Sequence, residues 1–208
     1  MRQRLISEMK AYLESIPEEN RIDAINAFRL ALHELSPFKE QPVDCVLWVK
    51  QECIDGNDYN PNNVAPPEKR LLLKSLEADG FTQPVVVMQH RENHFEIIDG
   101  FHRHELGKEK PALKKQLKGY LPVTCIRSGN QTRADRMAST VRHNRARGRH
   151  KIHDMSEIVR ELAQLGWKDE RISKELGMDS DEVLRLKQIN GLLELFADRR
   201  FSRAWTVK

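Results

Sequence analysis

Apolar residues recur every three or four positions through the first 36 residues, a spacing typical of amphipathic helices. One series consists of Leu5, Met9, Tyr12 and Ile16, and a second consists of Ile22, Ile25, Phe28, Leu32 and Leu35. Ser15 and Glu18 stand between the two series and predict a capping box at the start of the second helix. We therefore expect a helical hairpin over residues 1–40, with no chemistry of its own.

Short apolar runs separated by turn residues begin at Pro42 and predict a different architecture. Strands are predicted at residues 43–49, 84–89, 94–98 and 122–127, and an amphipathic helix at 68–79. This alternation is typical of a small mixed α/β domain, which we place at residues 41–131.

Helical periodicity returns after Thr132 and predicts a C-terminal helical module over residues 132–208. Helices are predicted at 133–147, 156–165, 168–176 and 179–195. The last two, with Gly177 between them, have the layout of a helix-turn-helix in which Asp179 caps the second helix and Val183 and Leu186 point inward. The predicted fold class is α+β: a small α/β domain between an N-terminal helical hairpin and a helix-turn-helix-like module.

Basic side chains are concentrated at the start of this C-terminal module. Residues 1–130 carry 18 basic and 19 acidic side chains, whereas residues 131–208 carry 17 and 12, for a net charge of +4. Seven of the basic residues lie within 133–151, against the single acid Asp135. Such a stripe indicates contact with a polyanion, such as nucleotide phosphates, nucleic acid or an acidic partner. A solvated basic face is the alternative.

No apolar run approaches the roughly 20 residues that a membrane-spanning helix needs. The first 16 residues also lack the continuous apolar core of a secretory signal. We expect a protein without a membrane partner that stays in the cytoplasm.

The segment IIDGFHRHELG, residues 97–107, combines the end of a predicted strand, a glycine turn and a cationic helix start. A helix N-terminus exposes amide N–H groups and a partial positive charge, so this arrangement favours a phosphate cradle. A plain turn with exposed charges is the alternative.

The start of the second helix of the helix-turn-helix is acidic, although this is where DNA-binding proteins contact bases. Asp181 and Glu182 would be repelled by DNA phosphates. Arg185, Lys187 and Gln188 are the candidates for DNA contact. A packing or partner-binding module remains the alternative to DNA contact.

Taken in order, these segments resemble the ParB/sulfiredoxin superfamily over residues 42–190. The matching boxes are Asn60-Pro61-Asn62, then GFTQP at 80–84, GFHR at 100–103 and HNRAR at 143–147, followed by the helix-turn-helix. The segments NDYNPNNVAPPE, DGFHRHELGKEK and DRMASTVRHNRARG are most similar to the IbrB-like subgroup. Its members are co-activators of prophage gene expression, often found beside a phosphoadenosine-phosphosulfate-reductase-like partner.

The resemblance implies a bound nucleoside triphosphate, CTP or ATP, whose phosphates lie between the two cationic segments. The nucleotide-binding residues it implies are Thr82, Gln83, Gly100, His102, Arg103, Asn144, Arg145 and Arg147. Asn144 would also help to hold Mg²⁺, but His143 replaces a glutamate of the family pattern and weakens such a site, because neutral imidazole is a poor partner for this hard cation. Phe101 stands where sulfiredoxins have their cysteine, so sulfiredoxin chemistry is excluded.

These observations favour a nucleotide-responsive, DNA-associated regulator, with a homodimer as a further expectation. The alternative is an enzyme, a slow NTPase or a phosphotransferase like the free-serine kinases of the superfamily. Among Glu52, Asp55, Asp58 and Asp99, we take Asp58 as the candidate catalytic carboxylate. A nuclease would need clustered metal-binding carboxylates, which the sequence does not clearly supply.

Overall fold

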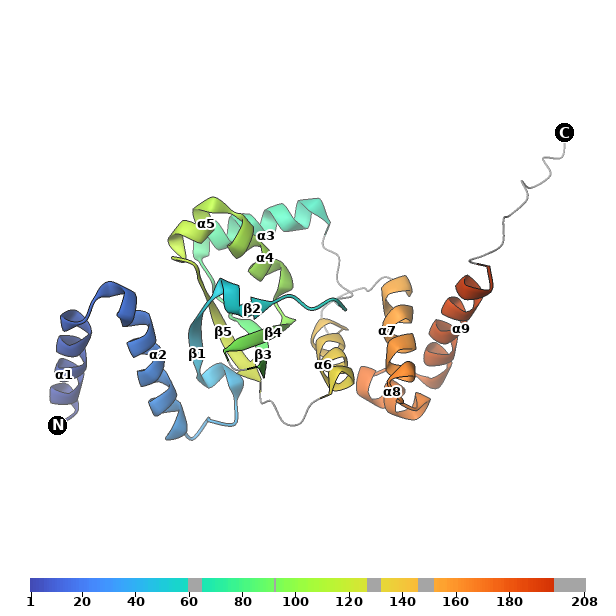
Figure 1. Ribbon diagram of the computed structural model, residues 1–208, viewed down its shortest axis with the longest axis horizontal. Coiled ribbons are helices and arrows are strands. Elements are labelled where there is room, and N and C mark those ends of the chain that lie inside the picture. Colours follow the sequence, from blue (N-terminus) through green and yellow to red (C-terminus); the bar gives the residue numbers. More distant parts are fainter. Residues whose placement is uncertain (60–64, 92, 127–131, 146–151, 197–208) are drawn as a thin grey trace. The chain divides into compact units, whose positions relative to one another are not determined.

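The chain folds into two compact units (Figure 1). The structure, a computed structural model, describes residues 1–59, 65–91, 93–126, 132–144 and 152–189 in full and residues 145 and 190–196 as backbone. The sheet unit consists of Met1–Asn57 and Val64–Gly129, and the helical unit consists of Asp58–Asn63 and Asn130–Lys208. Within the described ranges, no helix is long and apolar enough to cross a membrane.

Two helices open the sheet unit, α1 (Arg2–Ser15) and α2 (Glu18–Glu34), as the apolar spacing predicts. The predicted capping box between them is wrong. Ser15 is the last residue of α1, and its hydroxyl donates to the carbonyl of Tyr12 at 2.8 Å. Pro17 occupies the N-cap position of α2 instead.

Five strands form one sheet in the order β1-β5-β3-β4-β2. They are β1 (Val46–Lys50), β2 (Ile54–Asp55), β3 (Val85–Arg91), β4 (His94–Asp99) and β5 (Tyr120–Ile126). Strand β5 is antiparallel to β1 and parallel to β3, whereas β4 is antiparallel to β3 and parallel to β2. The alternate residues Val85 and Val87 of β3 are fully buried with Ile97 and Val123, so one face of the sheet carries the core.

Three helices pack together beside the sheet, in the upper part of Figure 1. They are α3 (Pro66–Asp79), α4 (Phe101–Glu109) and α5 (Pro111–Gln116), and they contribute Leu76, Leu106 and Leu113 to a second apolar cluster. Gly107 allows α4 to approach the sheet closely, because a Cβ there would lie 2.8 Å from the Leu121 side chain. This packing fixes the start of α4 directly after β4.

Helix α2 covers the outer edge of the sheet through its side chains. The Asn26 amide donates to the carbonyl of Trp48 at 2.7 Å and accepts from the Trp48 N–H at 3.0 Å, so it pairs with β1 as a neighbouring strand would. Arg29 donates to the carbonyl of Val46 at 2.8 Å. These bonds satisfy polar groups that an edge strand otherwise exposes.

The helical unit contains α6 (Arg133–Arg145), α7 (Ile152–Gln164), α8 (Asp169–Leu176) and α9 (Ser180–Phe196). One apolar cluster joins all four helices; its most buried members are Met137, Val141, Val159, Leu162, Ile172 and Val183. Gly177 ends α8 with φ of 63°, a left-handed conformation that glycine adopts readily. Asp179 accepts a 2.6 Å hydrogen bond from the Glu182 N–H at the start of α9, as predicted.

The predicted α+β fold class is therefore confirmed. Each predicted strand is present, with its ends shifted by at most three residues. Strand β2 and helix α5 are present without having been predicted. Val183 and Leu186 are buried, as the helix-turn-helix pattern requires.

Candidate nucleotide and DNA sites

A glycine turn joins β4 to α4 and forms the centre of the first candidate site. Gly100 has φ of 91°, and its N–H donates to the Asp99 carboxylate at 2.8 Å. A Cβ at Gly100 would lie 3.3 Å from the Cα of Val85 and 2.9 Å from the Arg103 guanidinium. The first helical hydrogen bond runs from the His104 N–H to the Gly100 carbonyl at 3.0 Å. The N–H groups of Phe101 and His102 come before this bond, at the helix start, where an anion is favoured.

The Arg103 side chain folds back across this turn. Its Nη1 donates to the side-chain oxygen of Gln83 at 2.6 Å, and its Nη2 lies 3.9 Å from a carboxylate oxygen of Asp99. The structure therefore brings together Gln83, Gly100 and Arg103, which the sequence predicted as nucleotide-binding residues. Thr82 lies beside Gln83 in the exposed loop between α3 and β3.

His102 lies on the side of α4 that faces α3. Its Nδ1 is 3.5 Å from the Glu105 carboxylate, which also forms a 2.7 Å ion pair with Lys69. The hydrogen bond from Lys69 lowers the pKa of Glu105. Lys69 therefore adds a cation beside the predicted cradle that the sequence reasoning did not single out.

Phe101, at the position where sulfiredoxins have their cysteine, has a packing role. A Cβ placed on Gly56 would lie 3.1 Å from its ring, so the glycine allows the loop after β2 to lie directly on Phe101. The ring also makes an edge-to-face contact with His102, with centroids 5.6 Å apart. An aromatic ring here stabilises the turn but offers no thiol.

His104 is a buried titratable group that sequence reasoning missed. Its side chain is 6% exposed, and burial lowers its pKa below the ordinary value of 6.5. The available signal was the run His102-Arg103-His104 at the start of a helix that directly follows a strand. One face of that first helical turn must meet the sheet, so one of these polar residues must be buried.

Within its described part, the basic helix α6 forms ion pairs with side chains of its own unit. Arg142 pairs with Glu175 of α8 at 2.7 Å, and Asp135 pairs with Arg171 of α8 at 2.9 Å. A hydrogen bond from Thr132 lowers the pKa of Asp135. The expected self-repulsion is therefore relieved in part without a bound polyanion.

Arg133, the first residue of α6, links two carboxylates. It donates to Glu161 of α7 at 2.6 Å and to the two Asp58 oxygens at 3.0 and 3.1 Å. These bonds raise the pKa of Arg133. Asp58, the candidate catalytic carboxylate, is thus held by an arginine of its own unit, and its catalytic role stays a prediction.

The other predicted residues of the basic stripe are only partly described. Asn144 is 7% exposed within α6. The side chain of Arg145, the whole of Arg147 and the Asn60-Pro61-Asn62 box lie outside the described residues. Among the residues that are described, no three His, Cys, Asp or Glu side chains come together as a metal site. Convergence of the two cationic segments stays a prediction.

Helices α8 and α9 form the second candidate site, a helix-turn-helix. Arg185 and Gln188 are exposed on α9, three positions apart and therefore on one face. Lys187 is half-buried and pairs with Asp169 at the start of α8 at 2.8 Å. The three predicted DNA contacts thus divide into two exposed side chains and one engaged in an ion pair.

Two known domains match the chain, and they cover most of these elements. The ParB N-terminal domain matches residues 38–127, and the IbrB-like C-terminal HTH domain matches residues 150–198. The protein YbdM of Escherichia coli (strain K12) is 67% identical over 208 residues, covering 100% of this chain and 98% of YbdM. The chain belongs to this ParB-like family. The predicted resemblance is confirmed, and it includes the IbrB-like features of the C-terminal module.

Solved ParB structures are similar to this chain at low TM-score and low sequence identity. The chromosome-partitioning protein ParB of Caulobacter crescentus, C-terminally truncated and complexed with CTP-gamma-S, gives a TM-score of 0.40 at 13% identity, covering 73% of this chain and 86% of that one. The same protein complexed to the centromeric parS site gives 0.42 at 14%, covering 71% and 77%. In this ParB-like chain, helix α6 lies between the two matched domains, and α1 and α2 precede the first.

Proposed function

We propose that this ParB-like protein is a nucleotide-responsive regulator that associates with DNA through its helix-turn-helix. The observation that carries the proposal is the Arg103 guanidinium, held by Gln83 and Asp99 over the Gly100 turn at the start of α4. The membership in a family built from a ParB N-terminal domain and an HTH domain supports it.

The chemistry of the turn suits a phosphate group. Backbone amides at a helix start and a guanidinium fork both donate hydrogen bonds to phosphate oxygens, and Gly100 leaves space for close approach. His102 and Lys69 lie nearby, and both are next to the Glu105 carboxylate. We assign the triphosphate of CTP or ATP to this turn. On the basis of the family resemblance, we assign Asn144, Arg145 and Arg147 as further contacts of the triphosphate.

Mg²⁺ is not part of the proposal. It takes an octahedron of oxygen ligands, and in the described residues Asn144 is the one candidate from the family pattern, with His143 where a glutamate is expected. Any Mg²⁺ that accompanies the nucleotide would rely on phosphate oxygens and water.

Helix α6 gives the proposed ligand a route to the DNA-binding module. Met137 and Val141 of α6 share one core with Val183 of α9, and ion pairs join α6 to α8. A ligand that displaced α6 residues would therefore repack the helices that present Arg185 and Gln188. Regulation of prophage gene expression with a reductase-like partner is the narrower form of this proposal, carried by the IbrB-like domain.

The phosphotransferase alternative is less well supported. It needs a general base aligned with an acceptor hydroxyl. Asp58 instead accepts two hydrogen bonds from Arg133, which restrict the orientation of its carboxylate.

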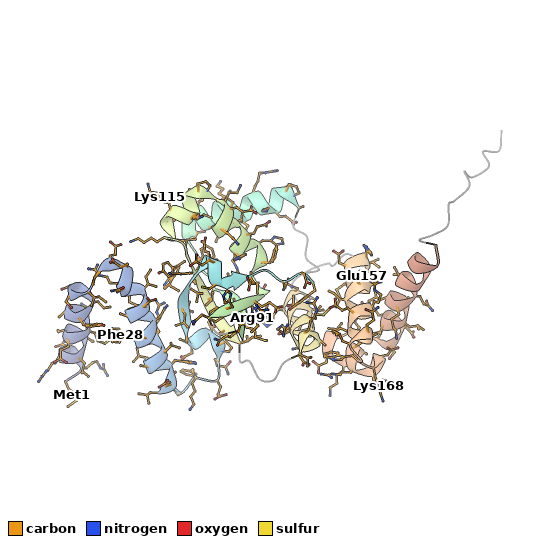
Figure 2. All side chains as sticks on the ribbon, in the orientation of Figure 1. Met1, Phe28, Arg91, Lys115, Glu157 and Lys168 are labelled. Atoms are coloured by element: carbon orange, nitrogen blue, oxygen red, sulfur yellow. The ribbon has the colours of Figure 1, made fainter. Side chains whose placement is uncertain are left out.

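The test is a titration of the purified full-length chain with CTP, ATP and ADP, with phosphate release followed in the same samples. We expect binding with little turnover and a loss of affinity of about tenfold to a hundredfold in Arg103→Ala, the value of one charge-assisted hydrogen bond. Arg91→Ala is the matched control, since Arg91 is an exposed arginine at the far end of β3 (labelled in Figure 2). Equal affinity in Arg103→Ala and the unchanged chain would refute the site, and phosphate transfer to serine would favour the kinase.

A further inference from the structure

The N-terminal helices expose a large share of their apolar side chains. Neither α1 nor α2 has a buried residue in the structure. On α1, Leu5, Ile6 and Tyr12 are 56%, 45% and 50% exposed. Leu32 of α2 is 66% exposed, and Leu35, directly after the end of α2, is 87% exposed. Isolated exposed apolar residues are common, but a continuous apolar face marks an interaction surface.

The hairpin does not cover this face by itself. Tyr12 and Phe28 make an edge-to-face contact with ring centroids 6.0 Å apart, close to the turn between the helices. Beyond it, α1 has little contact with any other described element. Figure 2 shows the side chains along both helices, with Phe28 labelled.

The energetics of α1 require a further contact. A single helix of 14 residues is marginal in water, because its nucleation cost is recovered only through packing of an apolar face. Helix α2 is already attached to β1 through Asn26 and Arg29, so it supplies an anchored platform. A partner that presents its own apolar helix would cover the remaining face of α1 and stabilise it.

The charges on α1 are complementary to those of a second, antiparallel copy of the same helix. They are Arg2, Arg4, Glu8, Lys10 and Glu14, and Arg4 also pairs with Glu8 of its own helix. When two copies lie antiparallel with Met9 at the centre, the basic start of each helix lies near Glu14 of the other copy. Parallel copies would instead place like charges together, which is unfavourable.

We propose that α1 and α2 form a self-association surface at which two copies of this chain pair antiparallel about a two-fold axis. Each copy then contributes two helices to a four-helix arrangement, and Leu5 of one copy meets the Tyr12 region of the other. The proposal is independent of nucleotide and DNA, because none of these residues belongs to the candidate sites.

The first experiment is sedimentation of the full-length chain, without nucleotide, over a range of concentrations. We expect twice the chain mass, and a dimer weakened by about a hundredfold in Leu5→Glu, because a two-fold interface contains each substitution twice. Leu71→Glu is the matched control, since Leu71 is an equally exposed leucine on α3, 69% exposed. A single-chain mass at every concentration, or equal dimerisation in Leu5→Glu and Leu71→Glu, overturns the proposal.

A charge exchange tests the antiparallel orientation. Arg4→Glu and Glu14→Arg should each weaken the dimer, and the double variant should restore it, because these two positions face each other when Met9 is at the centre. Within one helix they are about 15 Å apart, further than the screening length of about 10 Å, so restoration reports contact between copies. Failure of the double variant to restore the dimer refutes the antiparallel pairing. Binding of this surface to a different protein, without self-association, refutes it as well.

Discussion

Arg103 and Gln83 are joined by a 2.6 Å hydrogen bond that links the start of α4 to the loop before β3. Together with Asp99, Gln83 holds the guanidinium over the Gly100 turn instead of leaving it free in solvent. An arginine held in this way needs less ordering when an anion arrives. The same contact makes the local backbone sensitive to substitution, because the turn, the guanidinium and β3 are packed together.

Gly100→Ala tests how closely the turn is packed. The new Cβ would require φ of 91° from alanine and would press on the Cα of Val85, so we expect the free energy of unfolding of the sheet unit to fall by about 2–3 kcal/mol. Gly80→Ala is the control, since Gly80 has φ of 73° but nothing within 4 Å of its Cβ position, and it should cost about 1 kcal/mol. Hydrogen exchange of residues 85–109 in urea measures both. Equal losses of unfolding free energy in Gly100→Ala and Gly80→Ala would show that Val85 and Arg103 move aside from the new Cβ at little cost.

Burial of His104 predicts a pH dependence of stability. Its pKa is lowered in the folded protein, so the unfolded chain binds the proton more readily. The stabilising contribution is present above pH 6.5 and is lost as the pH falls from 6.5 through the folded pKa. The slope from one group is at most about 1.4 kcal/mol per pH unit.

His104→Gln should flatten this dependence, whereas His153→Gln, at an exposed histidine of α7, should not. The measurement is the free energy of unfolding from urea titrations between about pH 7.5 and about pH 5, above the range in which most carboxylates titrate. Glu105 acts in a separate window, because its lowered pKa gives a contribution that is present above pH 4.5 and lost below it. An unchanged slope in His104→Gln would remove His104 as the cause.

The sequence predicted most of the elements around the site because their signals are local. The β-branched run Val85-Val86-Val87 and the Asp99-Gly100 pair mark a strand and a turn without reference to the rest of the chain. Strand β2 was missed because two residues show no periodicity, and it is a strand only by pairing with β4.

Contacts between side chains that are far apart in the sequence could not be predicted from it. Nothing in the pattern of α2 distinguishes Asn26, which pairs with Trp48, from its other polar residues. The pairing of Arg142 with Glu175 likewise depends on how α6 and α8 pack, so a stripe that suggested unpaired charge is partly neutralised. Ser15 failed as a cap because the preceding helix already uses its hydroxyl.

Asn26→Ala tests the side-chain cover on β1. It removes both hydrogen bonds to Trp48 and leaves an N–H and a carbonyl at the sheet edge, so we expect a loss of about 1–3 kcal/mol in the free energy of unfolding. Faster hydrogen exchange of the Trp48 amide is the local readout. Asn20→Ala, at an exposed position of the same helix, controls for helix propensity and should change neither quantity by a comparable amount.

Salt dependence separates the two kinds of cation on α9. Arg185 is exposed, whereas Lys187 is paired with Asp169, so Arg185 is the better placed for a DNA phosphate. If α9 contacts duplex DNA, Arg185→Ala should reduce the slope of log affinity against log salt by about 1, the value for one phosphate contact. Lys187→Ala should leave that slope nearly unchanged while weakening the junction of α8 and α9. The measurement is a DNA titration at several salt concentrations with both variants, and the reverse order of effects would mean that Lys187 exchanges Asp169 for phosphate on binding.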